Sequence, residues 1–156
     1  TVDRIETVVD VLTWVSDRGE TSVDLAIERA IATVEDDRPD APLTVTGDTD
    51  TTVLADALLY LALYEVLDNA LQHGAPPVTV SVEERTDSVV VTVADTGTTV
   101  SVSTRESLFE PNTRGTDSEG DGLGLYLAAL ILDRYDGEIR MTGRSQTAFE
   151  IEVPKV

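Results

Sequence analysis

The stretch EVLDNALQH at residues 65–73 decides how the rest of this chain is interpreted. It ends a Leu- and Ala-rich segment whose composition predicts a long helix over about residues 53–72. Glu65, Asn69 and His73 follow one another at intervals of four residues, so on a helix they fall within one stripe. A polar stripe that interrupts an apolar helix indicates a binding site. Mg²⁺ prefers oxygen ligands, and the neutral amide oxygen of Asn69 can join its coordination sphere.

Three further segments follow in order: DTG at residues 95–97, FEP at 109–111 and GDGLGL at 120–125. Asp95 comes directly after a predicted strand, which should hold its carboxylate at the end of a sheet. The glycines of the last segment precede an apolar helix, so backbone amides and the helix N-terminus can hold phosphate oxygens there. No Lys-Ser or Lys-Thr follows them, which excludes a Walker loop. No strand precedes them, which excludes a Rossmann fingerprint.

The order and spacing of these four segments resemble the asparagine, first glycine, phenylalanine and second glycine boxes of a known family. That family is the catalytic ATP-binding domain of two-component sensor histidine kinases, a Bergerat (GHKL-type) branch of the superfamily that includes gyrase and MutL. The resemblance covers roughly residues 43–154. It implies ATP and Mg²⁺ as cofactors, with Asn69 as the Mg²⁺ ligand. It also implies that Asp95 accepts the adenine amino hydrogen, directly and through water, and that Gly97 lets backbone approach the ring.

The same resemblance assigns further groups to the triphosphate. Arg114 is expected to reach the β or γ phosphate, with Arg105 as a competing candidate. Phe109 and Pro111 are expected to anchor a lid over residues 98–120. The remaining nucleotide-binding positions implied are Gln72, His73, Gly120, Gly122, Leu123, Gly124, Leu125 and Thr147.

Glu65 and Arg114 are the candidate catalytic residues. In the ATPase branches of the superfamily, the acidic residue four positions before the asparagine is the general base, whereas many sensor kinases have Asn there. A role in orienting Mg²⁺ or water is the alternative for Glu65. His73 is the only histidine, and the resemblance places it beside the phosphates, not as the phosphorylated residue.

This chain departs from the family pattern at three positions. Thr99 replaces the second glycine of the first glycine box, Gln72 stands where relatives often have Lys, and Gln146 replaces the glycine of a late Gly-Thr-x-Phe segment. These departures bear on affinity for nucleotide more than on the fold.

The remaining patterns predict an α+β, two-layer sandwich, in which three helices cover one face of a mixed, mostly antiparallel sheet. The amphipathic stretch at residues 2–15 reads as a helix, and the resemblance makes residues 1–19 the end of a dimerisation and phosphoacceptor helix or a linker helix. An N-terminal helix packed on its own domain is the alternative. Residues 20–156 form the ATP-binding domain. Its predicted helices span about 21–35, 53–72 and 123–135, and its strands 43–46, 78–82, 89–93, 138–142 and 149–153.

Charge and composition indicate which partners, source and cellular location to expect. The 156 residues include 30 acidic and 11 basic ones, for a net charge of −19, and Lys155 is the only lysine. This balance argues against a nucleic-acid partner, which requires a basic surface. The near absence of lysine, with abundant Asp, Thr and Val, predicts a protein from a halophile, which we expect to be an archaeon. An ordinary acidic protein is the alternative. No run approaches the ~20 apolar residues of a membrane span, no signal peptide opens the chain, and there is no cysteine. We therefore expect a cytoplasmic domain without membrane contact, although its parent could be anchored.

The expected function is to bind Mg²⁺ and ATP and to donate the γ-phosphoryl group to a histidine on a separate helical domain. Its expected partners are that dimerisation and phosphoacceptor domain, within a parent that forms a homodimer, and a response regulator receiver domain. Two alternatives stay open. One is a GHKL-type conformational ATPase or a Ser/Thr protein kinase. The other is a non-catalytic interaction module with a degenerate nucleotide site.

Overall fold

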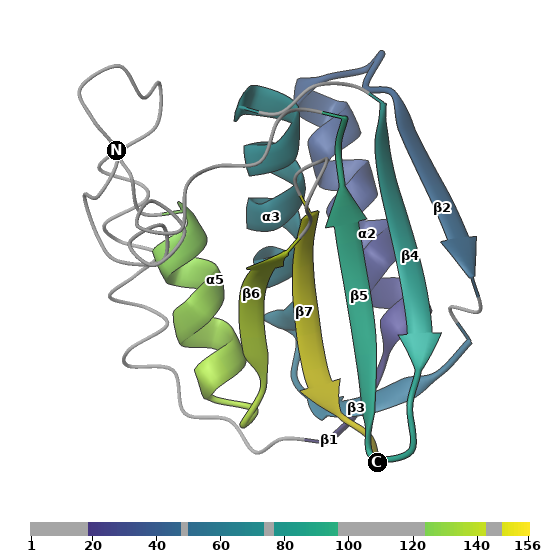
Figure 1. The fold of residues 1–156 in the computed structure, drawn as a ribbon, viewed down its shortest axis with the longest axis vertical. Coiled ribbons are helices and arrows are strands. Elements are labelled where there is room, and N and C mark those ends of the chain that lie inside the picture. The colour runs from purple at the N-terminus through teal and green to yellow at the C-terminus, as the bar shows by residue number, and fades with distance from the viewer. Residues whose placement is uncertain (1–18, 48–49, 74–76, 97–123, 143–147) are drawn as a thin grey trace.

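The computed structural model describes residues 19–47, 50–73, 77–96, 124–142 and 148–156. Within these residues, three helices cover one face of a five-stranded sheet whose strand order is β2-β4-β5-β7-β6 (Figure 1). The predicted two-layer α+β fold is confirmed. The helices are α2 (Val23–Asp37), α3 (Leu59–His73) and α5 (Gly124–Asp133). The strands are β2 (Leu43–Gly47), β4 (Val78–Glu84), β5 (Ser88–Ala94), β6 (Glu138–Thr142) and β7 (Ala148–Pro154).

The sheet is mixed and mostly antiparallel, as predicted. Only the β2–β4 pair is parallel among these strands. The alternation of the strands explains the core, because side chains two residues apart share one face. Val78, Val80 and Val82 of β4 are buried toward the helices, and so are Val89 and Val91 of β5.

One expectation is wrong: the central helix does not begin at Val53. Thr52–Ala55 instead forms strand β3, which pairs antiparallel with strand β1 (Gly19–Ser22) in a separate two-stranded sheet. Val53 and Ala55 are buried while the alternate residues are more exposed, which is the period of a strand and not of a helix. The helix starts only at Leu59, after Asp56 accepts a hydrogen bond from the backbone N–H of Leu58 at 2.9 Å.

The other elements within the described residues lie close to their predicted places. Ser22 caps α2, because its hydroxyl accepts from the backbone N–H of Leu25 at 3.2 Å, and the helix continues two residues beyond the predicted Glu35. β4 and β5 form the predicted hairpin. The predicted helix at residues 2–15 and the predicted lid at 98–120 lie outside the described residues.

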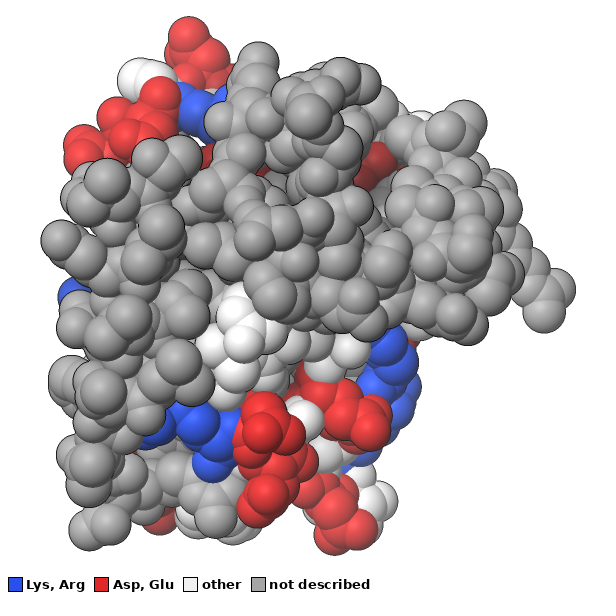
Figure 2. Space-filling view, turned by 90° about the vertical axis from the view of Figure 1, so that its left-hand side faces the viewer, with Lys and Arg blue, Asp and Glu red and all other residues white. Residues whose placement is uncertain are grey.

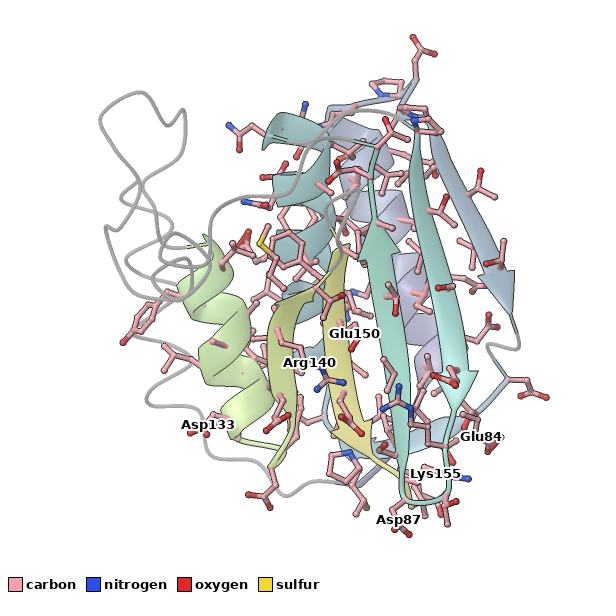
Figure 3. All side chains as sticks on the ribbon, viewed as in Figure 1. Glu84, Asp87, Asp133, Arg140, Glu150 and Lys155 are labelled. Carbon is pink, nitrogen blue, oxygen red and sulfur yellow. The ribbon has the colours of Figure 1, made fainter. Side chains whose placement is uncertain are left out.

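The face of the sheet turned away from the helices carries ion pairs between neighbouring strands (Figure 3). Arg140 on β6 donates to Glu150 at 2.8 Å and to Glu152 at 3.1 Å, both on β7. The hydroxyl of Ser88 and the Arg140 guanidinium lower the pKa of Glu152. Val90 lies on this face beside Glu152 in the register and is only 1% exposed. The paired side chains therefore shield an apolar residue as well as one another.

Candidate functional site

Helix α3 carries the asparagine box. It packs against α5 on one side, α2 on the other and β5 beneath. The C-terminal ends of α3 and β5 and the N-terminal end of α5 all lie at the upper end of the molecule (Figure 1). The asparagine box, the end of the strand before Asp95 and the start of α5 are thus at one end of the fold.

Glu65 and Gly124 face each other across the α3–α5 interface. Glu65 is buried, with 2% of its surface exposed, although it carries a carboxylate. A Cβ atom built on Gly124 would lie 3.4 Å from Oε1 of Glu65 and 3.9 Å from its Cδ. The space between the start of α5 and the carboxylate is therefore about as large as one methyl group.

Asn69 and Gln72 lie further along α3, and both are partly buried. Asn69 is one turn beyond Glu65, so both side chains leave the helix on nearly the same side. His73 is the last residue of α3. Asp95 follows the central strand β5 and is 2% exposed. A buried carboxylate at a strand end is a fixed hydrogen-bond acceptor.

The other predicted nucleotide-binding residues fall into two groups. Leu125 is 3% exposed and belongs to the apolar core, so what it can offer a ligand is its backbone. The rest lie outside the described residues, namely Gly97, Arg105, Phe109, Pro111, Arg114, Gly120, Gly122, Leu123 and Thr147.

A buried polar cluster at the opposite end of the α3–α5 pair was not predicted. Asp56 is 9% exposed and accepts a hydrogen bond from the hydroxyl of Tyr135 and another from Nη2 of Arg134 at 3.3 Å. Burial, followed by the hydrogen bond and the charge of Asp56, raises the pKa of Tyr135 well above its usual value. The tyrosine is therefore held in its protonated, donating form. An Asp after a strand and before a helix is a capping signal, but its partners 78 and 79 residues away are not marked in the sequence.

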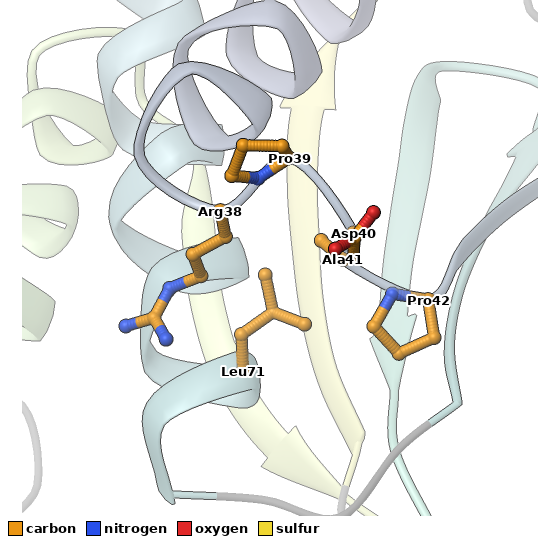
Figure 4. A pocket seen from close by; sticks show the side chains of 6 residues that line it. All are labelled: Arg38, Pro39, Asp40, Ala41, Pro42 and Leu71. Carbon is orange, nitrogen blue, oxygen red and sulfur yellow. The ribbon is translucent and has the colours of Figure 1, made fainter.

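A cavity of about 360 Å³ lies at the C-terminal ends of α2 and α3 (Figure 4). Its lining comes from the loop after α2 and from α3, namely Arg38, Pro39, Asp40, Ala41, Pro42 and Leu71. Leu71 is two residues beyond Asn69 and projects about 200° away around the helix. The cavity is therefore distinct from the Glu65–Gly124 pair.

Figure 2 views the molecule from the side on which α5 lies. On the part of this face that the structure describes, acidic and basic side chains lie next to one another. The acidic excess of the chain is thus partly neutralised locally, as it also is on the open face of the sheet.

Comparison with protein families identifies the family to which this fold belongs. The family of histidine kinase-, DNA gyrase B- and HSP90-like ATPases matches residues 55–156. The chain belongs to this family. The match begins just before α3 and includes Glu65, Asn69, Asp95 and Gly124. The predicted catalytic ATP-binding domain of the histidine kinase type is confirmed.

Sensor kinases are among the relatives of this domain. It is 32% identical over 109 residues to the swarming motility regulation sensor protein RssA of Serratia marcescens, covering 66% of this chain and 23% of that protein. It is 35% identical over 101 residues to the sensor histidine kinase DpiB of Escherichia coli, covering 58% of this chain and 18% of that protein. The chain thus spans about a fifth of the length of the curated relatives it matches.

Solved structures show the same fold. The mycobacterial sensor histidine kinase MprB superposes with a TM-score of 0.78 at 25% identity, covering 88% of this chain and 97% of that one. ShkA, solved in complex with AMPPNP, superposes with a TM-score of 0.79 at 20% identity, covering 99% of this chain and 35% of that one. Among the residues that our structure describes, no helix is both long enough and apolar enough to cross a membrane.

Proposed function

We propose that this domain binds Mg²⁺-ATP at the end where Glu65, Asn69, Asp95 and Gly124 lie, and donates the γ-phosphoryl group to a histidine on a separate helical domain. The proximity of Glu65 and Gly124 carries this proposal, because it brings the asparagine box and the second glycine box together in space. The family match and the AMPPNP complex of a structural relative support it.

Three features of the described residues support this proposal. Asp95 is a buried acceptor suited to the adenine amino group. Gly124 begins α5, and a helix N-terminus favours phosphate oxygens. Asn69 would supply an amide oxygen to hold Mg²⁺, and the ion would offset the charge of the phosphates. We assign Gln72, His73, Gly97 and Thr147 to the same pocket as supporting contacts.

Phosphoryl transfer is catalysed mainly by positioning and by neutralising charge. We assign the neutralisation of charge to Arg114. We also propose that residues 98–120 form a lid that Phe109 anchors. For Glu65 we propose the role of general base, since its carboxylate is held beside the start of α5. If Glu65→Gln leaves both phosphotransfer and ATP hydrolysis at their original rates, the residue orients Mg²⁺ or water instead.

A conformational ATPase is the second candidate, because Glu65 is retained where the ATPase branches keep their base. The two functions differ in the product. A kinase domain makes phosphohistidine when its acceptor is supplied, whereas a conformational ATPase releases inorganic phosphate only.

The proposal also concerns the parent protein and its partners. The parent would be a sensor kinase that dimerises through a helical phosphoacceptor domain and passes phosphate to a response regulator receiver domain. The charge of −19 with one lysine supports the cytoplasm of a halophile. Since such a surface repels an anionic nucleotide, affinity should rise as KCl is raised from low values.

Calorimetric titration with Mg²⁺ and ATP in high KCl tests the proposal. We expect binding by the unmodified chain, strong loss with Asp95→Ala, and loss of Mg²⁺ dependence with Asn69→Ala. Absence of binding heat and of any thermal shift would favour a non-catalytic module. With labelled ATP the chain alone should stay unlabelled, and phosphohistidine on it would contradict the assignment of His73.

A further inference from the structure

Asp56 joins the start of α3 to the end of α5. Its Oδ1 accepts from the backbone N–H of Leu58 at 2.9 Å and from the hydroxyl of Tyr135, and its Oδ2 accepts from Arg134 at 3.3 Å. The Asp56 side chain is 6% exposed and Tyr135 is 0% exposed. Hydrogen bonds to a charged group in such a dry position are among the stronger ones.

This cluster and the candidate nucleotide site occupy opposite ends of one helix pair. Glu65 lies six residues beyond the first residue of α3, which corresponds to roughly 9 Å along that helix. Gly124 lies nine residues before the last residue of α5, which corresponds to roughly 14 Å along that helix. A change in how the two helices meet at one end therefore moves the groups that face each other at the other end.

The carboxylate of Asp56 has a fixed anchor of its own. It follows β3 directly, and β3 is paired with β1 along its whole length. Val53 of β3 also forms a bridge with Lys155 near the C-terminus. Asp56 thus links the end of α5 to strand β3, which belongs to neither helix.

We propose that Asp56 is a positioning residue for nucleotide binding, which sets the spacing between Glu65 and Gly124 by holding Tyr135 and Arg134. The inference rests on the proposed function, since it concerns the same site. The competing explanation is that the cluster stabilises the fold and leaves the site untouched. The two differ in one respect: a purely structural cluster changes the melting temperature, whereas a positioning cluster also changes affinity in the fully folded protein.

Tyr135→Phe tests the proposal because it removes one hydroxyl and keeps the buried ring. Tyr64→Phe is the matched control. Tyr64 also donates its hydroxyl to an aspartate, Asp37, at 3.3 Å, but that bond is exposed and joins α3 to α2. The dissociation constant of Mg²⁺-ATP is measured by calorimetry at a temperature well below the melting points of all variants.

We expect Tyr135→Phe to weaken nucleotide binding roughly five- to tenfold, as losing a hydrogen bond to a buried charge allows, and Tyr64→Phe to leave it within about twofold. Asp56→Asn should weaken binding further, and adding Tyr135→Phe to it should change little, because the two groups act as a unit. If Tyr135→Phe lowers the melting temperature but binds as tightly as the control, the proposal is overturned.

Hydrogen exchange without nucleotide gives a second, independent readout. Exchange of the amides around Glu65 in α3 and in the first turn of α5 should be faster in Tyr135→Phe than in Tyr64→Phe. Equal exchange in these segments would also overturn the proposal. If the unmodified chain fails to bind nucleotide, the proposed function fails, and the exchange comparison still decides whether Asp56 positions the two helices.

Discussion

Replacing Gly124 tests whether the start of α5 and Glu65 form one site. A Cβ at this position would meet Oε1 of Glu65 at 3.4 Å, which is ordinary contact, so Gly124→Ala should fold. Because alanine is a better helix former, the substitution should raise stability by up to about 1 kcal/mol. Gly124→Val branches at that same Cβ and crowds a carboxylate that is 2% exposed. Overpacking of this kind costs about 1–3 kcal/mol.

If that cost falls on the nucleotide site, Gly124→Val should weaken Mg²⁺-ATP binding by roughly five- to a hundredfold, at 1.4 kcal/mol for each factor of ten. Calorimetric titration of both variants measures it, with urea unfolding to confirm that each is folded. Gly19→Val is the matched control, since no atom lies within 4 Å of a Cβ placed there. A folded Gly124→Val that binds nucleotide as tightly as the Gly19 variant would refute the assignment of this pair to the site.

Three further outcomes follow from the geometry. Gly47→Ala should cost about 2 kcal/mol or more in urea unfolding, because φ is +89° and a Cβ would lie 2.6 Å from a backbone carbonyl oxygen. Stability should hold up to about pH 10 and then fall, because the raised pKa of Tyr135 keeps its proton in the folded state while the unfolded chain loses it; Tyr135→Phe should show a smaller fall. In acid, stability should decrease below about pH 4, because the unfolded chain takes up a proton at Glu152 while the lowered pKa of this residue in the folded state resists protonation; Ser88→Ala should reduce that decrease.

The sequence predicts most of this fold because its signals are local. The β4–β5 hairpin follows from two alternating valine-rich runs, and the cap of α2 follows from Ser22. The start of α3 was misplaced because Thr52–Ala55 continues the apolar character of the helix. Pairing with β1 makes this segment a strand, and β1 lies more than 30 residues earlier. Tertiary pairing of this kind overrides local propensity.

The functional residues also differ in whether local sequence signals mark them. Glu65, Asn69, Asp95 and Gly124 could be selected from three short segments, because each chemical requirement is met within a few residues. The Asp56 cluster could not be found by such a search, since its members are ordinary residues 78 and 79 positions apart. Only the antiparallel placement of α3 and α5 makes them neighbours.

Helix α3 shows why one stretch of sequence indicates both fold and function. Leu63 and Leu67 are buried in the core, which fixes the helix over the sheet. Asp68 pairs with Arg38 at 3.4 Å, which fixes it against the end of α2. Glu65 then has little freedom to turn away from Gly124, because rotating the helix would expose leucines and break the pairing with α2. The polar stripe is therefore held toward α5 by the same residues that build the core, and substitutions at Leu63 or Leu67 should alter nucleotide affinity as well as stability.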